Sequence, residues 1–271
     1  MNEARILNCD AGFILEELDN KLAPHGYMMP LDLGAKGSCM IGGNVATSAG
    51  GIRLLRYGSL HAHLLGLTVY AIEVLPTEQG TILKLGSTHK KDNTSLHTPH
   101  LFLGSEGQLG VITRVAIGAV PKPASVQSAM LGVDTFESCC AVLRMARRHL
   151  SEILSSFEFL DREVMVVLDE ALGLKPVLKT NPRFTLLAQS VAESAAMWRL
   201  RESAPLAVAA DGFVFKNDVS LPLKHFYGLT EEVRARCSSM SKRIVTYGHL
   251  GDGNSHLNIV AKEYSKEVHD K

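Results

Sequence analysis

The chain has 271 residues, 46% of them hydrophobic and 21% charged, and its formal net charge is zero. These values are typical of a globular protein with one or two domains, and they offer no electrostatic basis for binding nucleic acid or an anionic membrane. No apolar run is long enough to span a bilayer, and five cysteines without CxxC spacing indicate free thiols. Without a signal peptide or an Arg-rich presequence, the chain by itself indicates a cytosolic protein, unless its natural start lies upstream.

The first part of the chain predicts a small sheet and one surface helix. Arg5–Cys9 predicts a short strand, and Gly12–Leu22 carries apolar residues at helical spacing with acidic residues opposite. Leu64–Leu75 is an apolar, β-branched run that predicts a buried strand. Thr77–Gly80 predicts a turn, after which Thr81–Leu85 returns as the second strand of a hairpin.

A glycine-rich stretch, Pro30–Gly51, lies between the predicted helix and the hairpin. Glycine permits positive φ angles and leaves amide N–H groups accessible to an anion or a flat ring. A flexible linker is the alternative, but Met40, Ile41 and Val45 have the spacing of buried residues. We therefore favour a ligand-binding loop, and Arg53 and Arg56, just after it, would contact either a phosphate-bearing cofactor or solvent.

A second glycine cluster, Gly104, Gly107 and Gly110, leads directly into an alternating strand that begins at Val111. A loop of this kind, flanked by strands, again suits close approach of the backbone to a ligand. Its spacing is GxxGxxG and no helix is predicted after it, so the Rossmann fingerprint is absent, as is a GxxxxGK[ST] phosphate loop.

Pro121-Lys-Pro123 predicts a domain boundary, which divides the chain into residues 1–120 and 121–271. The alternation of strands and helices beyond it predicts an α+β unit with helices on one side of a sheet. The predicted elements are strands at Val126–Val133, Ser155–Leu160, Phe184–Ala188 and Gly212–Ser220, helices at Phe136–His149, Asp161–Leu172, Ala192–Ala210 and Leu223–Cys237, and a hairpin at Arg243–Val260. Pro205 is expected to kink or break the third helix.

The final hairpin carries two histidines on either side of a GDGN turn signal. If Leu250 pairs with Ser255, His249 lies opposite His256 with Cβ atoms roughly 4.5–5.5 Å apart, close enough to chelate one ion. Asn258 then points to the same face. A metal site and a pair of structural histidines are both open on this geometry, since two ligands alone do not make a site.

Two upstream cations are candidates for holding an anionic substrate near these histidines. Arg201 lies in the helix segment WRLRESAP, and Lys216 lies within the apolar strand FVFKND. Arginine binds a carboxylate in a bidentate manner and lysine acts as a point charge, although most such side chains are simply solvated. Lys216 is the stronger candidate, because a lysine among apolar neighbours either extends to solvent or has a function.

Four segments together resemble the FAD-dependent D-2-hydroxyglutarate dehydrogenases, members of the vanillyl-alcohol oxidase superfamily of FAD-linked oxidases. The segments are PLDLGAKGSCMIGGNVATSAGG, RYGSL, LFLGSEGQLGVIT and VTYGHLGDGNSHLN. The resemblance implies an α+β protein with a partial PCMH-type FAD-binding domain over residues 1–120, followed by an antiparallel-sheet substrate or cap domain over residues 121–271. It implies FAD and Zn²⁺ as cofactors, and oxidation of D-2-hydroxyglutarate, a 2-hydroxy diacid, by hydride transfer to flavin.

The resemblance also implies roles for individual residues. His249 and His256 match the family's zinc ligands, and Arg201, Lys216 and Asn258 match residues that hold substrate. The positions that match flavin-contacting or loop-shaping residues are Pro30, Gly34, Ala35, Gly37, Gly42, Gly43, Asn44, Gly104, Ser105, Glu106, Gly110 and Ile112. A flavoprotein or quinone-linked electron acceptor and a mitochondrial location, or a cytoplasmic one for a bacterial protein, are implied by the relatives rather than by this chain.

The chain departs from the family pattern in ways that affect its expected activity. The family's first FAD subdomain, its third zinc ligand and its catalytic histidine have no counterpart here, and a strand-and-helix unit is expected to be missing between Ser190 and Ala192. Pro205 replaces a substrate-binding threonine. We therefore expect a truncated chain that is inactive alone; a D-lactate or glycolate dehydrogenase of the same superfamily and a non-catalytic chain are the alternatives.

Overall fold

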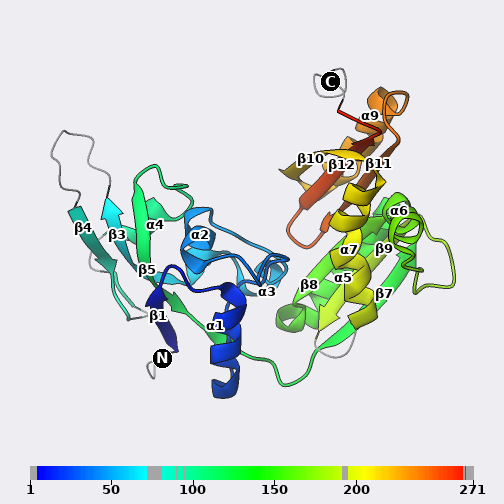
Figure 1. Ribbon diagram of the computed structural model, residues 1–271. Coiled ribbons are helices and arrows are strands. Elements are labelled where there is room, and N and C mark those ends of the chain that lie inside the picture. The colour runs from blue at the N-terminus through cyan, green and yellow to red at the C-terminus, as the bar shows by residue number, and fades with distance from the viewer. Residues whose placement is uncertain are drawn as a thin grey trace. The chain divides into compact units, whose positions relative to one another are not determined.

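The computed structural model describes residues 5–71, 81–89, 91–93, 96–190, 195–264 and 266. The chain forms two compact units, Met1–Ala124 and Ser125–Lys271, each with a sheet of its own (Figure 1). The predicted turn at 77–80, the end of the first hairpin strand and the point proposed for a missing unit lie outside the described residues. No described helix is long and apolar enough to cross a membrane.

The first unit is built on a four-stranded antiparallel sheet in the order β1-β5-β3-β4. Its strands are β1 (Ile6–Asp10), β3 (Leu64–Ala71), β4 (Thr81–Gly86) and β5 (Gly110–Gly118), and a separate pair joins β2 (Tyr27–Met28) to β6 (Val120–Pro121). Its helices are α1 (Leu15–Leu22), α2 (Ile41–Ala46), α3 (Leu54–Tyr57) and α4 (Pro99–Phe102), with 3₁₀ turns at Ala23–His25 and Leu60–Ala62. The strands and the first helix expected from the sequence are confirmed where they are described.

One face of this sheet is covered by α1 and α2 (Figure 1). The apolar positions of α1 recur at helical spacing and are almost fully buried, as are Ile41 and Val45 of α2. They pack against alternate residues of the strands, including Leu67 and Ile117. Met40 was expected to be buried with Ile41 and Val45, but it is 53% exposed, because it precedes α2 and only the next residues turn into the core.

The second unit is a six-stranded antiparallel sheet in the order β10-β12-β11-β8-β9-β7. Its strands are β7 (Gln127–Val133), β8 (Ser156–Asp161), β9 (Phe184–Ser190), β10 (Phe213–Ser220), β11 (Arg243–His249) and β12 (Asn254–Ala261). Its helices are α5 (Phe136–Leu150), α6 (Arg162–Leu172), α7 (Ala195–Asp211), α8 (Leu223–Phe226) and α9 (Gly228–Cys237), with a 3₁₀ turn at Ser151–Ile153. Asp161 caps α6 by accepting a hydrogen bond from the Val164 amide, which sets the strand end and the helix start.

The helices of this unit lie on both faces of the sheet, so the expectation that they share one side is wrong. Leu160 and Val245 pack with α6 and α7, whereas Phe159 packs with rings from α5 and α8. Successive residues of a strand point to opposite faces of the sheet, so the central strands pack against helices on both faces. An α+β protein of antiparallel sheets is confirmed, with its sheet buried from two sides.

Helix α7 continues through Pro205, so the break expected there does not occur. Leu200, Ala204, Ala207 and Val208 form its buried stripe, while Pro205 lies on the exposed side. The expected Leu223–Cys237 helix is instead two helices, α8 and α9, which meet at Tyr227.

Candidate functional site

The two glycine-rich segments of the first unit lie side by side. The Gly104 amide donates a hydrogen bond to the Val45 carbonyl at 3.1 Å, and the Glu106 amide donates to the Ala46 carbonyl at 2.9 Å. The second loop therefore closes onto the C-terminal end of α2. Glu106 has a φ of 49°, a left-handed backbone that a non-glycine residue adopts only when its surroundings hold it there.

The glycines of these segments serve two physical purposes. A Cβ at Gly42 would come within 2.5 Å of the Ala11 Cβ, so this glycine allows α2 to pack against the end of β1. No atom lies within 4 Å of a Cβ built at Gly34, Gly43 or Gly107, so those backbones are open on that side. An open, side-chain-free backbone is the arrangement that lets a flat ring or a phosphate approach.

The predicted flavin residues differ in exposure, and their contacts stay predictions. The buried positions are Pro30, Gly42, Asn44 and Gly110; the half-buried ones are Ser105 and Ile112; the exposed ones are Gly34, Ala35, Gly37, Gly43, Gly104 and Glu106. Of the exposed members, Gly43 lies in α2 and the others lie on the two loops.

Arg53 holds the first glycine-rich segment in place. Its guanidinium lies 3.1 Å from Asp19 and 3.2 Å from Asp32, and it donates hydrogen bonds to the Met29 carbonyl at 2.7 Å and the Leu31 carbonyl at 3.3 Å. Because these partners use its donors, Arg53 is a structural anchor, and neither a phosphate-bearing cofactor nor solvent accounts for its position.

The histidine hairpin of the second unit has a different register from the one expected. His249 pairs with Asn254 and Tyr247 pairs with His256, so the expected pairing of His249 with His256 is wrong by two residues. The loop consists of residues 250–253, in which Leu250 is fully buried and Gly253 has a φ of 80°. A shift of two preserves the face of every side chain, so both histidines still lie on the same face.

The two imidazoles are close neighbours, with ring centroids 5.3 Å apart. His249 Nδ1 lies 2.8 Å from Glu158 Oε1, and His256 Nδ1 lies 3.2 Å from Asp218 Oδ1. Burial, aided by the nearby charge of Arg201, lowers the pKa of His256, so its imidazole is held neutral. A neutral imidazole whose Nδ1 faces a carboxylate leaves Nε2 with the lone pair that a metal ion needs.

Glu158, in the middle of β8, connects this pair to the predicted substrate residue on α7. Its side chain is 1% exposed, and Oε2 accepts a hydrogen bond of 2.8 Å from Arg201 Nε. Burial alone would raise the pKa of Glu158, but the charge of Arg201 and the hydrogen bonds from Arg201 and His249 outweigh it and lower that pKa. An ionised glutamate thus lies between a guanidinium and an imidazole.

Two further predicted residues lie on the same face of the sheet. Asn258 is buried and is the register partner of Lys216, which is exposed on the edge strand β10. The Arg201 guanidinium lies 5.2 Å from the Tyr247 ring centre, and Tyr247 is the register partner of His256. Arg201, His249, His256 and Asn258 are therefore brought together by α7, β11 and β12, while Lys216 extends from the strand beside them.

Glu158 was not among the residues predicted from the sequence. A carboxylate between Phe157 and Phe159, in a strand buried at every position, was the signal that could have identified it. No group of three His, Cys, Asp or Glu side chains arranged to hold a metal ion is found among the residues that the structure describes. Two imidazoles alone supply half of a tetrahedral zinc site.

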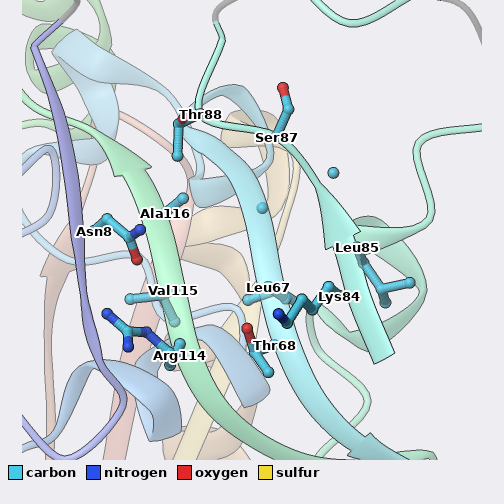
Figure 2. A pocket seen from close by; sticks show the side chains of 12 residues that line it. Asn8, Leu67, Thr68, Lys84, Leu85, Ser87, Thr88, Arg114, Val115 and Ala116 are labelled. Atoms are coloured by element: carbon cyan, nitrogen blue, oxygen red, sulfur yellow. The ribbon is translucent and has the colours of Figure 1, made fainter. Parts of the chain in front are cut away.

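Figure 2 shows a separate hollow of about 210 Å³ on the sheet of the first unit, lined by residues such as Thr68, Lys84 and Arg114. None of the predicted flavin residues lines it. Arg114 pairs with Asp10 at 3.5 Å, and both side chains are more than half exposed. This open hollow is therefore distinct from the glycine-rich loops.

Comparison with known proteins finds matches for both parts of the chain. The family "FAD linked oxidases, C-terminal domain" matches residues 122–189 and 179–271, and the family "FAD binding domain" matches residues 1–86. The chain is 41% identical over 97% of its length to the mitochondrial D-2-hydroxyglutarate dehydrogenase of Bos taurus, of which it covers 53%. It is 40% identical over 97% of its length to that of Arabidopsis thaliana, of which it covers 52%, so it spans about half the length of these curated relatives.

Solved structures share the fold at low sequence identity. A structure of alkyldihydroxyacetonephosphate synthase matches 96% of this chain with a TM-score of 0.71 and 13% identity, and the match covers 58% of that protein. The 4-ethylphenol oxidase of Gulosibacter chungangensis matches 95% of this chain with a TM-score of 0.62 and 9% identity, and the match covers 62% of that protein. The resemblance expected from the four motifs is confirmed, as is the fold class, and the chain belongs to the FAD-linked oxidases.

Proposed function

We propose that this chain belongs to an FAD-dependent enzyme that oxidises D-2-hydroxyglutarate to 2-oxoglutarate. The observation that carries the proposal is the hydrogen-bonded group of Arg201, Glu158 and His249, the first two buried and the third half-buried, which lies beside His256 and Asn258 on one face of the sheet. Relatives about 40% identical, including those of Bos taurus and Arabidopsis thaliana, are named D-2-hydroxyglutarate dehydrogenases. Residues 1–120 would bind FAD, and residues 121–271 would bind substrate.

The glycine-rich loops fit a flavin cofactor. Gly34, Gly43 and Gly107 leave open backbone where a side chain would otherwise stand, and the two loops are tied together by the Gly104 and Glu106 amides. FAD, when bound, supplies the ring that accepts hydride from the substrate. The chain's own part is to hold that cofactor through backbone amides, which needs no large side chains.

Zinc fits the hairpin as a partial site. His249 and His256 present imidazoles whose Nδ1 atoms face carboxylates, which is the arrangement found around zinc-binding histidines. Zinc, when bound, supplies a Lewis acid for the substrate hydroxyl. Since two described donors leave the coordination incomplete, we expect the chain by itself to bind zinc weakly and to show no turnover.

The substrate would be held by groups that recognise carboxylates and a polar oxygen. Arg201 has its Nε engaged by Glu158, which fixes the guanidinium plane and directs its remaining N–H groups to an anion. Lys216 supplies a second positive charge beside Asn258, so a diacid has a partner for each end. D-lactate has one carboxylate, and a relative in Schizosaccharomyces pombe is named a putative D-lactate dehydrogenase, which makes D-lactate the second candidate.

The cellular setting follows the names of the relatives. Those of Bos taurus, Arabidopsis thaliana and Rattus norvegicus are named mitochondrial, and we propose the same compartment here. A flavoprotein or quinone-linked acceptor, the class that the family resemblance implies, would take up the two electrons that oxidation of the substrate releases.

The test is a visible absorption spectrum of the purified chain with added FAD, followed by D-2-hydroxyglutarate, D-malate and D-lactate in turn. A protein-bound flavin band that stays oxidised with every substrate is expected for this chain. Bleaching by D-2-hydroxyglutarate would establish the substrate and refute the expected lack of turnover, and bleaching by D-lactate alone would favour the second candidate. No bound flavin at all would refute FAD binding by these loops.

A further inference from the structure

Glu158 is the acceptor in both of the hydrogen bonds that its carboxylate makes. Oε2 accepts from Arg201 Nε and Oε1 faces His249 Nδ1, each at 2.8 Å. Arginine has no acceptor and stays protonated in proteins, and an ionised carboxylate has no proton to donate. Both contacts therefore require the partner to be the donor, which places a proton on His249 Nδ1.

We propose that Glu158 is a positioning residue, which holds a proton on His249 Nδ1 and thereby leaves Nε2 as the atom available to a metal ion. This inference rests on the proposed zinc role of His249 for its functional meaning, but the tautomer itself can be measured without metal. The same carboxylate aligns Arg201 through Nε, so one side chain orients a metal donor and a substrate-binding cation.

The strands and the helix around Glu158 fix its position and its two partners. It lies at the centre of β8 with 1% exposure, and His249 on β11 is its register partner. Arg201 approaches from the buried stripe of α7. A buried carboxylate without both partners would be costly, so the three groups form one unit rather than two separable pairs.

A purely structural ion pair between Glu158 and Arg201 would also join α7 to the sheet. The two interpretations differ at His249, because a structural pair makes no demand on its tautomer. The substitution Glu158→Gln separates them. It preserves size, but glutamine has one carbonyl oxygen and one NH₂ group, so it can accept from only one of the two partners.

Arg201 cannot accept a hydrogen bond, so in this variant the glutamine carbonyl must face Arg201 and the glutamine NH₂ group must face His249. His249 Nδ1 then has to accept, and its proton moves to Nε2. We therefore expect E158Q to invert the His249 tautomer while the fold is retained. The inversion occupies the nitrogen left for metal, and zinc affinity should fall by about 10- to 100-fold, the range for loss of such an orienting partner.

The readout is the ¹⁵N spectrum of the histidine rings, recorded without metal at a pH of about 8, where unperturbed imidazoles are neutral. Ring nitrogens with and without a proton are separated in this spectrum, and the His249 signals are assigned by their loss in H249N. His63 serves as an internal reference, because its Nε2 lies 2.7 Å from the Tyr57 carbonyl and must carry the proton. Wild-type His249 and His63 should therefore show opposite tautomers.

The matched control is E158Q combined with R201M. Without the guanidinium, the carbonyl of the introduced glutamine is free to turn to His249, so the double variant should regain the Nδ1–H tautomer that E158Q loses. A structural role for Glu158 predicts no such recovery. His63 should keep its tautomer in every variant.

A wild-type His249 protonated at Nε2 alone would overturn the proposal, whether or not E158Q folds. An E158Q chain that folds and keeps the Nδ1–H tautomer would overturn it as well. Zinc titration is interpreted separately: if the tautomers behave as expected but no variant binds zinc, the positioning role stands and the zinc part of the proposed function fails.

Discussion

Arg53 gives the most direct test of how the cofactor loop is held. Arg53→Met keeps the length and apolar stem of the side chain but removes the charge shared by Asp19 and Asp32 and the hydrogen bonds to the Met29 and Leu31 carbonyls. The Arg53 side chain is 17% exposed and the two carboxylates are 20% and 12% exposed, so water replaces these contacts only in part.

Breaking a fully buried ion pair costs about 3–5 kcal/mol, and partial exposure here reduces the expected loss to about 2–3 kcal/mol. At about 1.4 kcal/mol for each factor of ten, this raises the opening equilibrium of the first unit by about 30- to 150-fold. Native-state hydrogen exchange of β5 measures that opening apart from the second unit. FAD affinity should fall with it, because the loop residues lose their fixed backbone.

The matched control lies in the same unit. Arg114→Met removes an ion pair with Asp10 whose side chains are 52% and 68% exposed, and exposed pairs contribute about 0–1 kcal/mol. Exchange of β5 in this variant should stay within about fivefold of wild type. Equal effects of the two substitutions would refute the view that Arg53 anchors the loop.

Two further predictions concern glycine and cysteine positions. Gly51→Ala should abolish FAD binding, because at φ 91° its Cβ would come within 2.1 Å of the Asp32 carbonyl oxygen. Gly26→Ala is the control: Gly26 is left-handed, at φ 76° and ψ 22°, with no atom within 4 Å of the added Cβ, so this substitution should cost only about 1–2 kcal/mol of backbone strain. Equal losses of FAD affinity would contradict this. Burial raises the pKa of Cys9 to about 11 and that of Cys139 to about 12. At pH 8 each is therefore a thiolate in about one molecule in a thousand or fewer. Because the thiolate is the form that reacts, mass spectrometry after brief alkylation should find both cysteines unmodified until the chain is denatured.

Local patterns were sufficient for most elements of both units. Apolar spacing identified α1, α5 and α6, and the β-branched run at Leu64 identified β3. A helix face or a whole strand that is buried requires apolar residues at regular positions, which can be recognised in the sequence. The glycine clusters likewise marked the two loops that lie side by side in the first unit. These features depend on neighbours in the chain, which the sequence contains explicitly.

The hairpin register shows where local reasoning failed. The GDGN signal placed the loop one residue too late at each end, since it could not include the burial of Leu250 or the hydrogen bond from the Gly251 amide to the Phe157 carbonyl. Gly253 is likewise held by its carbonyl, which accepts from the Leu221 amide. Those contacts come from β8 and from the residue that follows β10, both far away in the sequence, and together they select the four-residue loop at 250–253.

Residue identities alone indicated the family, its cofactor and which histidines, cations and glycines to consider, because those motifs are contiguous. The tertiary structure decided how they are connected: Glu158, 43 residues before Arg201 and 91 before His249, joins a helix to a strand end through one buried carboxylate. It also decided that Arg53 holds the chain rather than a cofactor. Such roles depend on which groups share a buried volume, and proximity across long stretches of chain is set only when the sheets form and their helices pack.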